Sequence, residues 1–258
     1  MWIDFEFLFN FTQQKQNIGG LIMLDEIRID DVLFLDIETV PGTPDYDSLP
    51  DKLKTLWDKK AEQIGWKDPE QTPQELYGRA GIYAEFGKIV CISCGFVNGN
   101  GFRVRSFYGD DERILLEEFA ALLNRSYSGH RTLLCGHNSK EFDIPYIARR
   151  MLINGLKLPS ILNIAGKKPW EVRHLDTMDL WKFGDYKHYT SLELLATIFD
   201  IPTPKDDIDG SQVGEVYWKE KDLERIAKYC EKDVLTTAQL LRRYLGMPPI
   251  KPEFVVSV

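Results

Sequence analysis

The stretch Val32–Gly42, VLFLDIETVPG, places two acidic side chains within an otherwise apolar segment. Its branched and aromatic residues predict a buried strand, and the Pro and Gly at its end predict a turn. Side chains at positions i and i+2 share one face of a strand, so we expect Asp36 and Glu38 to stand roughly 7 Å apart on the same side. Two ionised carboxylates in that arrangement repel each other unless a cation lies between them. The pair therefore marks either a solvated strand end or part of a divalent-metal site.

The composition is that of an ordinary globular protein. Of the 258 residues, 43% are hydrophobic and 28% are charged, which allows one large domain or two small ones with a substantial core. No apolar run approaches the roughly 20 residues that cross a bilayer. The opening MWIDFEFLFNFTQQKQ lacks the basic region and the cleavage site of a signal peptide. We therefore expect no membrane partner and a cytoplasmic location.

The net charge of -8 argues against a protein that coats nucleic acid by bulk electrostatics, because such domains are usually basic. It does not exclude an enzyme that holds a few nucleotides. Bound metal ions and a local group of Lys and Arg can offset an acidic site. Charge alone leaves the partner open.

Cysteine spacing does not indicate a zinc site. Cys91 and Cys94 belong to a predicted strand, KIVCISCGFV, in which residues i and i+3 face opposite sides and cannot bind one ion. No second Cys pair or His pair follows at zinc spacing. We expect these two residues, with Cys135 and Cys230, to be buried reduced thiols.

Predicted strands and helices alternate along the chain. Met23 opens the segment MLDEIRIDDVLFLDIET, which we expect to begin the first strand. Branched and aromatic residues predict strands over 32–38, 88–97, 102–109 and 132–138. An apolar period near 3.6 predicts helices over 110–127, 144–156, 191–200 and 221–245. This alternation is typical of an α/β domain with a mixed sheet covered by helices.

We divide the chain into three parts. Residues 1–22 fit no clear pattern and form an N-terminal extension, 23–246 form the domain, and 247–258 form a C-terminal tail. The domain carries an insert at about 45–86, which is polar and contains Trp57, Trp66 and Tyr77. The insert is either a flap beside a cleft or a helical structural element.

Further acidic residues follow in two places. Asp143, in GHNSKEFDIPYI, falls where a loop enters a helix, a position at which a carboxylate often caps the helix. Tyr229 and Asp233, in AKYCEKDVLTT, lie one turn apart on one helical face. Taken alone, such a pair is usually found on the surface.

Three segments, DIET, HNSKEFD and YCEKD, resemble in this order the three exonuclease motifs of the proofreading domain of family B DNA polymerases. Their pattern of Asp-x-Glu, Asn-x-x-x-Phe-Asp and Tyr-x-x-x-Asp marks the tyrosine branch of the DEDD exonuclease superfamily. The histidine branch has His five residues before the last Asp, where this chain has Lys228. The resemblance extends from Val32 to Tyr244 and implies a ribonuclease-H-like fold for the 23–246 domain. A polymerase continues into a longer polymerising region, so a chain that ends at Val258 resembles a stand-alone exonuclease.

The resemblance also implies a set of metal ligands. Asp36 would bridge two divalent cations, Glu38 and Asp233 would hold the cation that generates hydroxide, and Asp143 would hold the leaving-group cation through water. Oxygen ligands suit Mg²⁺ or Mn²⁺ rather than zinc. Tyr229 would orient the attacking water, because a phenol with a pKa near 10 is a poor general base at neutral pH.

Two other residues match positions that contact the terminal nucleotides in the family. Asn138 would make a polar contact and Phe142 would stack on a base, although Phe142 is equally well explained as a core ring. Thr39 would either contact the 3' end or simply complete the strand. The pair Asp176 and Asp179 is not needed by the family pattern, and we expect both residues to be structural.

The leading hypothesis is therefore a metal-dependent 3'-5' exonuclease that releases nucleoside 5'-monophosphates from single-stranded ends. The polymerase resemblance favours DNA as the partner, and RNA is the alternative, since no motif senses a 2'-hydroxyl decisively. A third hypothesis is a catalytically silent nucleic-acid-binding module, because a fold does not by itself establish a function. All four carboxylates and the tyrosine are nevertheless present.

Deleting residues 1–22 should leave both stability and nuclease activity unchanged, because the first predicted strand and the family resemblance begin after them. The measurement compares the melting temperature and the rate of 3'-5' cleavage of the truncated and full chains. A large loss of either quantity would show that the segment is not a dispensable extension.

Overall fold

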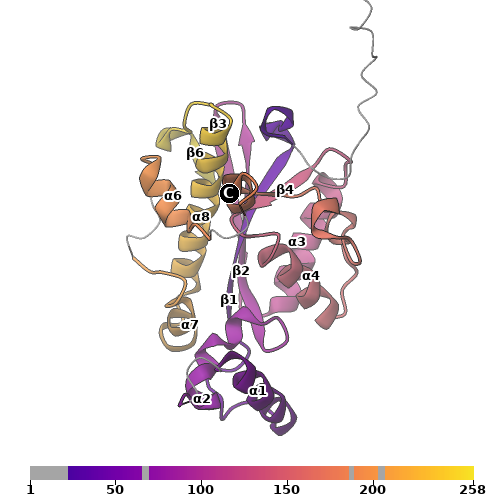
Figure 1. Ribbon diagram of the computed structural model, residues 1–258, viewed down its shortest axis with the longest axis vertical. Helices are drawn as coiled ribbons and strands as arrows, with labels where there is room; N and C mark the ends of the chain where they lie inside the picture. The colour runs from indigo at the N-terminus through magenta and orange to yellow at the C-terminus, as the bar shows by residue number, and fades with distance from the viewer. Residues whose placement is uncertain (1–22, 66–69, 186–188, 203–206) are drawn as a thin grey trace, which may run out of the picture.

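A computed structural model of the chain describes residues 23–65, 70–185, 189–202 and 207–258. The extension 1–22 and Trp66 of the insert lie outside the described residues. Figure 1 shows a central sheet with helices on both sides. None of the described helices is long and apolar enough to span a membrane.

The sheet has six strands in the order β5-β4-β1-β2-β3-β6. Their bounds are β1 Val32–Pro41, β2 Gly87–Asn98, β3 Gly101–Tyr108, β4 Leu133–Gly136, β5 Leu175–Asp176 and β6 Val255–Ser257. The strands β1, β2 and β3 are antiparallel neighbours, whereas β4, β5 and β6 join in parallel pairs. The sheet is therefore mixed, which confirms the α/β class expected from the sequence.

Helices cover both faces of the sheet. The α-helices are α1 Asp51–Ile64, α2 Pro73–Leu76, α3 Glu112–Ser126, α4 Asp143–Ile153, α5 Thr177–Lys182, α6 Leu192–Ile198, α7 Val213–Glu215 and α8 Leu223–Tyr244. On one face, Leu35 of β1 packs in a core with Leu116 of α3 and Ile147 of α4. On the other face, Phe34 packs in a core with Val234 of α8. This alternation follows from the period of two along β1.

The first strand covers the predicted residues 32–38, but the segment 23–31 that leads into it is not extended. Residues Leu24–Glu26 and Ile29–Asp31 form two short 3₁₀ turns, and β1 starts at Val32. Each turn contains two adjacent acidic residues, and such residues favour turns over a half-buried strand. Ile27 and Ile29 still pack in the core beneath α8.

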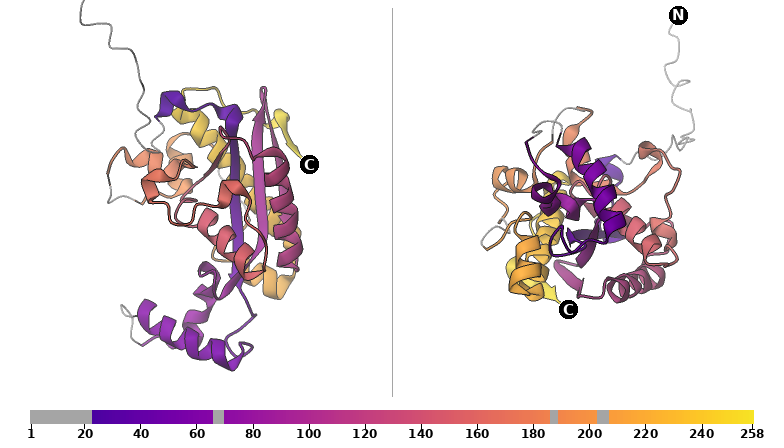
Figure 2. Two further views of the ribbon diagram at one scale, coloured as in Figure 1. Left: turned by 90° about the vertical axis from the view of Figure 1, so that its right-hand side faces the viewer. Right: turned by 90° about the horizontal axis from the view of Figure 1, so that it is seen from below.

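The insert at 45–86 is helical and irregular, as expected, and consists of α1, α2 and the 3₁₀ segment Tyr77–Ile82. It stands beyond the ends of β1 and β2 (Figure 2). Trp57 is fully buried in its own small core, with its ring 5.4 Å from that of Tyr77 and its indole N–H donating to the Pro73 carbonyl at 2.8 Å. These two aromatic rings serve the structure of the insert, which favours the structural reading for this part of it.

Residues 247–258 do not form a separate tail. Val255–Ser257 add strand β6 to the edge of the sheet, where they pair in parallel with β3. The Gln239 side chain of α8 fixes the segment before this strand through two hydrogen bonds to the backbone of Ile250, at 2.7 and 2.9 Å. The predicted boundary at 246 fails because a three-residue edge strand is too short to show a periodic pattern.

A buried ion pair joins the helices on one face to the sheet. The Glu112 carboxylate accepts hydrogen bonds from Arg150 at 2.5 and 2.8 Å, from Asn154 at 2.9 Å and from the backbone of Ile89 at 2.7 Å. Arg150 also donates to the Ala84 carbonyl at 2.8 Å. The network therefore links α3, α4, β2 and the end of the insert.

Replacing Glu112 with Ala should lower the free energy of unfolding by about 3–5 kcal/mol, because it leaves the Arg150 charge buried without its partner. The matched control is Glu117→Ala, which breaks an exposed pair with Arg113 at 2.9 Å and should cost about 0–1 kcal/mol. Urea unfolding of both variants measures the difference. Equal losses would contradict a structural role for the buried network.

Candidate active site

Strand β1 directs two carboxylates toward α8. Phe34 and Val40 pack in the cores beneath that helix, and Asp36 and Glu38 share their face because side chains alternate along a strand. Glu38 is 7% exposed and Asp36 is half-buried. The strand continues past both residues to Pro41. The burial of Glu38 argues against a solvated strand end.

A local irregularity lies beside this pair. The register between β1 and β2 shifts between Glu38 and Thr39, which face Cys91 and Ile89 respectively. The extra residue is Val90, and both Val90 and Cys91 pack in the core beneath α8. Such bulges redirect neighbouring side chains and often occur near functional sites. Thr39 is half-buried at this bulge.

Asp143 reaches the same place from the start of α4. The pairing of β1 with β4 covers Val32 to Phe34 only, so the later part of that edge of β1 is not bonded to β4. The Ile37 N–H there donates to Asp143 Oδ1 at 3.1 Å. Helix α4 begins after Phe142 without a side-chain cap. Asp143, which is 4% exposed, therefore bonds to β1 instead of capping the helix.

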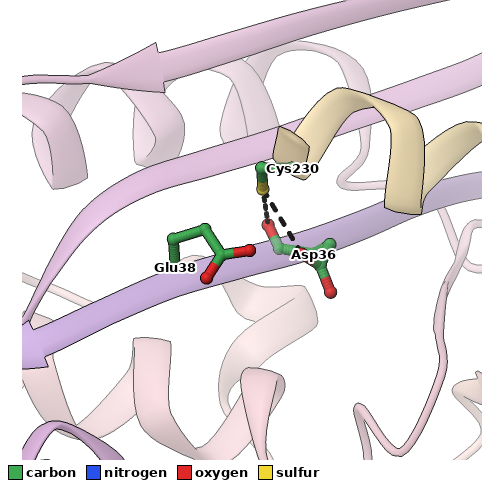
Figure 3. A group of neighbouring side chains, drawn as sticks. All are labelled: Asp36, Glu38 and Cys230. Atoms are coloured by element: carbon green, nitrogen blue, oxygen red, sulfur yellow. Dashed lines mark hydrogen bonds between the residues drawn. The ribbon is translucent and has the colours of Figure 1, made fainter. Parts of the chain in front are cut away.

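Helix α8 covers the carboxylates from above. Ile226, Cys230 and Val234 are buried at intervals of four residues. The Cys230 thiol donates to Asp36 Oδ2 at 3.4 Å (Figure 3). Tyr229 and Asp233 lie beside this stripe and line a cavity of about 500 Å³ with Asp36, His137 and residues of the 191–193 and 209–210 segments. The cavity opens the carboxylate cluster to solvent.

The four predicted ligands perturb one another. Burial, followed by the charges of Asp143, Asp233 and Glu38, raises the pKa of Asp36 well above its usual range. Burial and then Asp233 do the same to the pKa of Glu38. Burial raises the pKa of Asp143 to about 7, with Asp233 among the contributing charges. The structure thus brings all four carboxylates within electrostatic reach of each other.

Three carboxylates of this cluster have no cationic partner among the described residues. Within the part of the chain that the structure describes, no Lys, Arg or His forms an ion pair with Asp36, Glu38 or Asp143. Ligand atoms of Asp36, Glu38 and Cys230 lie within 4.8 Å of one another. Buried carboxylates of this kind fit a divalent cation, and a set dominated by oxygen favours Mg²⁺ or Mn²⁺.

Tyr229 remains a neutral phenol near this charge. Burial, followed by the charges of Asp233, Glu38 and Asp36, raises the pKa of Tyr229 far above its ordinary value. A phenol in this environment can donate a hydrogen bond but does not readily lose its proton.

The loop before α4 is held by Asp176. The backbone N–H groups of Asn138 and Lys140 donate to the two oxygens of its carboxylate at 2.9 and 3.0 Å, and Asp176 also caps α5. This is the structural role expected from the sequence. Asp179 forms ion pairs with Lys140 and Lys182, each at 3.1 Å, and is likewise structural.

Asn138 and Phe142, the two predicted substrate contacts in this loop, differ in the surroundings of their side chains. Asn138 has a φ of 63°, which Asn tolerates better than most residues, and its Oδ1 is buried without a hydrogen-bond partner. An unmatched acceptor of this kind can receive a donor from a ligand. Phe142 is half-buried, packs against the core and lies 5.4 Å from the Tyr146 ring. Phe142 therefore contributes to the core and keeps part of its ring exposed.

The cysteines are buried as predicted, and two histidines are held by hydrogen bonds. His137 contacts Thr177 Oγ1 and the Thr190 carbonyl, both at 2.9 Å, although its ring also lines the cavity. His174 contacts the Ile161 carbonyl at 3.0 Å. All four cysteines are buried and free. The sequence analysis missed the contact of Cys230 with Asp36. The sequence feature that could have indicated this contact is the position of Cys230 on the apolar stripe of α8, between Ile226 and Val234.

Comparison with solved structures supports the same fold. The chain matches the family B DNA polymerase from the hyperthermophilic archaeon Pyrobaculum calidifontis with a TM-score of 0.51 and 17% identity, over 83% of this chain and 24% of that one. This likeness and the sheet described above show a ribonuclease-H-like fold. In sequence, the chain is 23% identical over 185 residues to a DNA polymerase of Pyrococcus glycovorans, which covers 63% of this chain. The chain spans 23% of that polymerase.

The family follows from residues 82–248, which match the model of a predicted 3'-5' exonuclease related to the exonuclease domain of PolB. The chain belongs to this family. The matched residues include Asn138, Phe142, Asp143, Tyr229 and Asp233, whereas the strand that carries the first carboxylate pair precedes them. In the sheet, that strand lies between β2 and β4, which both belong to the matched residues.

Without divalent cations, the Asp143 carboxyl should make the protein less stable as the pH rises from about 4 to about 7. Its folded-state pKa is raised to about 7, whereas an unfolded Asp titrates near pKa 3.9, so the unfolded chain binds fewer protons in this window. A bound cation removes the repulsion and, at 100 times its dissociation constant, adds about 2.7 kcal/mol.

Melting temperatures with EDTA and with Mn²⁺, across this pH window, test the expectation. Asp143→Asn is the matched control, because the amide keeps an oxygen for the Ile37 N–H but cannot ionise. The parent should lose more stability with rising pH in EDTA than this variant does. Parallel pH profiles of the two proteins would contradict it.

Proposed function

We propose that this protein is a metal-dependent 3'-5' exonuclease that hydrolyses phosphodiester bonds at the 3' end of single-stranded nucleic acid and releases nucleoside 5'-monophosphates. DNA is the favoured substrate. The observation that carries the proposal is the convergence of Asp36, Glu38, Asp143 and Asp233 beside one open cavity that Tyr229 also lines. Family membership supports the direction of cleavage, because the family is described as 3'-5' exonucleases.

The four carboxylates are the groups that would hold two divalent cations. Asp36 interacts with all three of the other carboxylates. After burial, the charges of Asp143, Asp233 and Glu38 each raise the pKa of Asp36. This position agrees with a role as the ligand shared by both cations, with Glu38 and Asp233 on one and Asp143 on the other. Such cations, when bound, activate a water and neutralise the charge that develops on the phosphate and the leaving oxygen.

Tyr229 is assigned to positioning rather than to proton abstraction. Its raised pKa keeps the hydroxyl protonated at neutral pH. A protonated hydroxyl on the cavity wall can orient the attacking water through a hydrogen bond. Proton removal then depends on the metal site and not on the phenol.

The substrate's end would lie against the loop before α4. Asn138 offers a buried oxygen with no hydrogen-bond partner among the described residues, Phe142 keeps a partly exposed ring for a base, and Thr39 lies at the bulge of β1. Stacking on an aromatic ring tolerates any base and contributes roughly 1–3 kcal/mol. These three residues are proposed substrate contacts.

Labelled oligonucleotides test the reaction directly. Single-stranded DNA and RNA, labelled at the 5' or the 3' end, are incubated with protein and Mg²⁺, Mn²⁺ or EDTA. The proposal expects a 5'-labelled DNA ladder that shortens from the 3' end only with a metal. Faster cleavage of RNA would identify an exoribonuclease, and binding without cleavage would identify a silent module.

Two substitutions separate metal binding from water orientation. Asp36→Ala removes the carboxylate expected to contact both cations, so cleavage should fall to near background. Tyr229→Phe keeps every ligand and removes one hydroxyl, so cleavage should fall by roughly 10- to 1,000-fold while Mn²⁺ affinity changes little. The matched control is Asp179→Asn, a structural acid paired with Lys140 and Lys182.

Turnover, Mn²⁺ titration and oligonucleotide affinity are measured for the parent and all three variants. Removal of negative charge from the site should also keep or tighten oligonucleotide binding by the Asp36 variant. Parental turnover in a pure preparation of Asp36→Ala would show that the metal-site assignment is wrong.

A further inference from the structure

Cys230 points a thiol into the carboxylate cluster. Its Sγ lies 3.4 Å from Asp36 Oδ2 and 3.4 Å from the Asp36 carbonyl oxygen, and the residue is fully buried (Figure 3). Ligand atoms of Cys230, Asp36 and Glu38 all lie within 4.8 Å of one another. A sulfur atom therefore belongs to the first layer of groups around the proposed metal site.

The spacing of these atoms suits a single small cation. In a tetrahedral zinc site with bonds of about 2.3 Å to sulfur and about 2.0 Å to oxygen, sulfur and oxygen ligands are roughly 3.5 Å apart. The Cys230 and Asp36 side chains already have this separation. Glu38 reaches toward the same point from the next inward-facing position of β1 (Figure 3).

The position of Cys230 distinguishes it from Cys94 and Cys135, whereas Cys91 packs in the same core as Cys230. Cys94 belongs to the apolar core on the opposite face of the sheet, together with residues of α3 and α4. Cys135 packs in an apolar core with Phe34 and Val234. Among the cysteines, which all lie in the described residues, Cys230 alone joins a group of potential metal ligands there.

We propose that Cys230 makes the carboxylate cluster selective for thiophilic divalent cations, so that Asp36, Glu38 and Cys230 bind Zn²⁺ or Cd²⁺ more tightly than Mg²⁺. Sulfur ligands favour soft cations, whereas Mg²⁺ requires oxygen. The thiol releases its proton to solvent when the soft cation binds. Such a cation occupies Asp36 and Glu38, and it therefore competes with the cations that support cleavage. The inference rests on the proposed function only through these shared carboxylates.

The test uses the full chain freed of metal with EDTA and then titrated with Cd²⁺ or Zn²⁺. Cadmium bound to sulfur produces a charge-transfer absorption in the ultraviolet, which requires no enzymatic activity. The parent and Cys94→Ser should both show this absorption at one equivalent per chain, and Cys230→Ser should not. Affinity for Zn²⁺, measured against a chromogenic chelator, should weaken roughly tenfold or more in Cys230→Ser.

Two further measurements keep the result interpretable. Cys230→Ala replaces Cys230→Ser if the serine variant does not fold, and the cadmium NMR signal of the parent reports sulfur coordination without any substitution. Absence of the absorption in the parent, or its persistence in both Cys230 variants, would overturn the inference. Cleavage with Mg²⁺ but no sulfur-bound cadmium would leave the proposed function standing, whereas sulfur-bound cadmium without cleavage would leave only the inference.

Discussion

The burial of Asp36 and Glu38 between β1 and α8 is the constraint on which the other features of the site depend. The positions that flank this pair on the same face of β1, Phe34 and Val40, are filled by apolar side chains that pack beneath the helix. Two carboxylates at intervening positions cost folding free energy, because each ion loses water without gaining a counter-ion among the described residues. Burial disfavours the charged form of both carboxyls and thereby raises their pKa values. A site for cations is the physical condition under which such an arrangement is stable with the carboxylates ionised.

The backbone around the pair is arranged to bring further groups to it. Strand β4 stops pairing with β1 at Phe34, and the N–H of Ile37 is then used to hold Asp143. On the other edge, the bulge at Glu38 and Thr39 interrupts the regular ladder with β2. Helix α8 closes the face and adds Asp233. Each interruption of regular pairing thus occurs where a polar side chain joins the cluster.

The sequence predicted the strands β1 to β4 and the helices α3, α4, α6 and α8, because apolar periodicity is a local signal, but it missed the short strands β5 and β6. It did not predict the two 3₁₀ turns before β1, since Ile27 and Ile29 supply apolar residues without forming a strand. It missed the contact of Cys230 with Asp36, which joins residues 194 positions apart and depends on how α8 lies on the sheet. The part of the insert around Trp57 was also ambiguous, because the same aromatic residue can serve a flap or a core.

The C-terminal strand connects to the site through the helix that carries the last motif. Within YCEKD, Tyr229 and Asp233 face the cavity and Cys230 faces Asp36. Glu231 points elsewhere and accepts hydrogen bonds from Ser106 of β3 at 2.9 Å and from Ser257 of β6 at 3.0 Å. Successive residues of one helical turn are therefore fixed to different parts of the sheet, which restrains rotation of α8 about its axis. Because Tyr229 and Asp233 move with that rotation, strand β6 helps to set the geometry of the site although it contributes no residue to it.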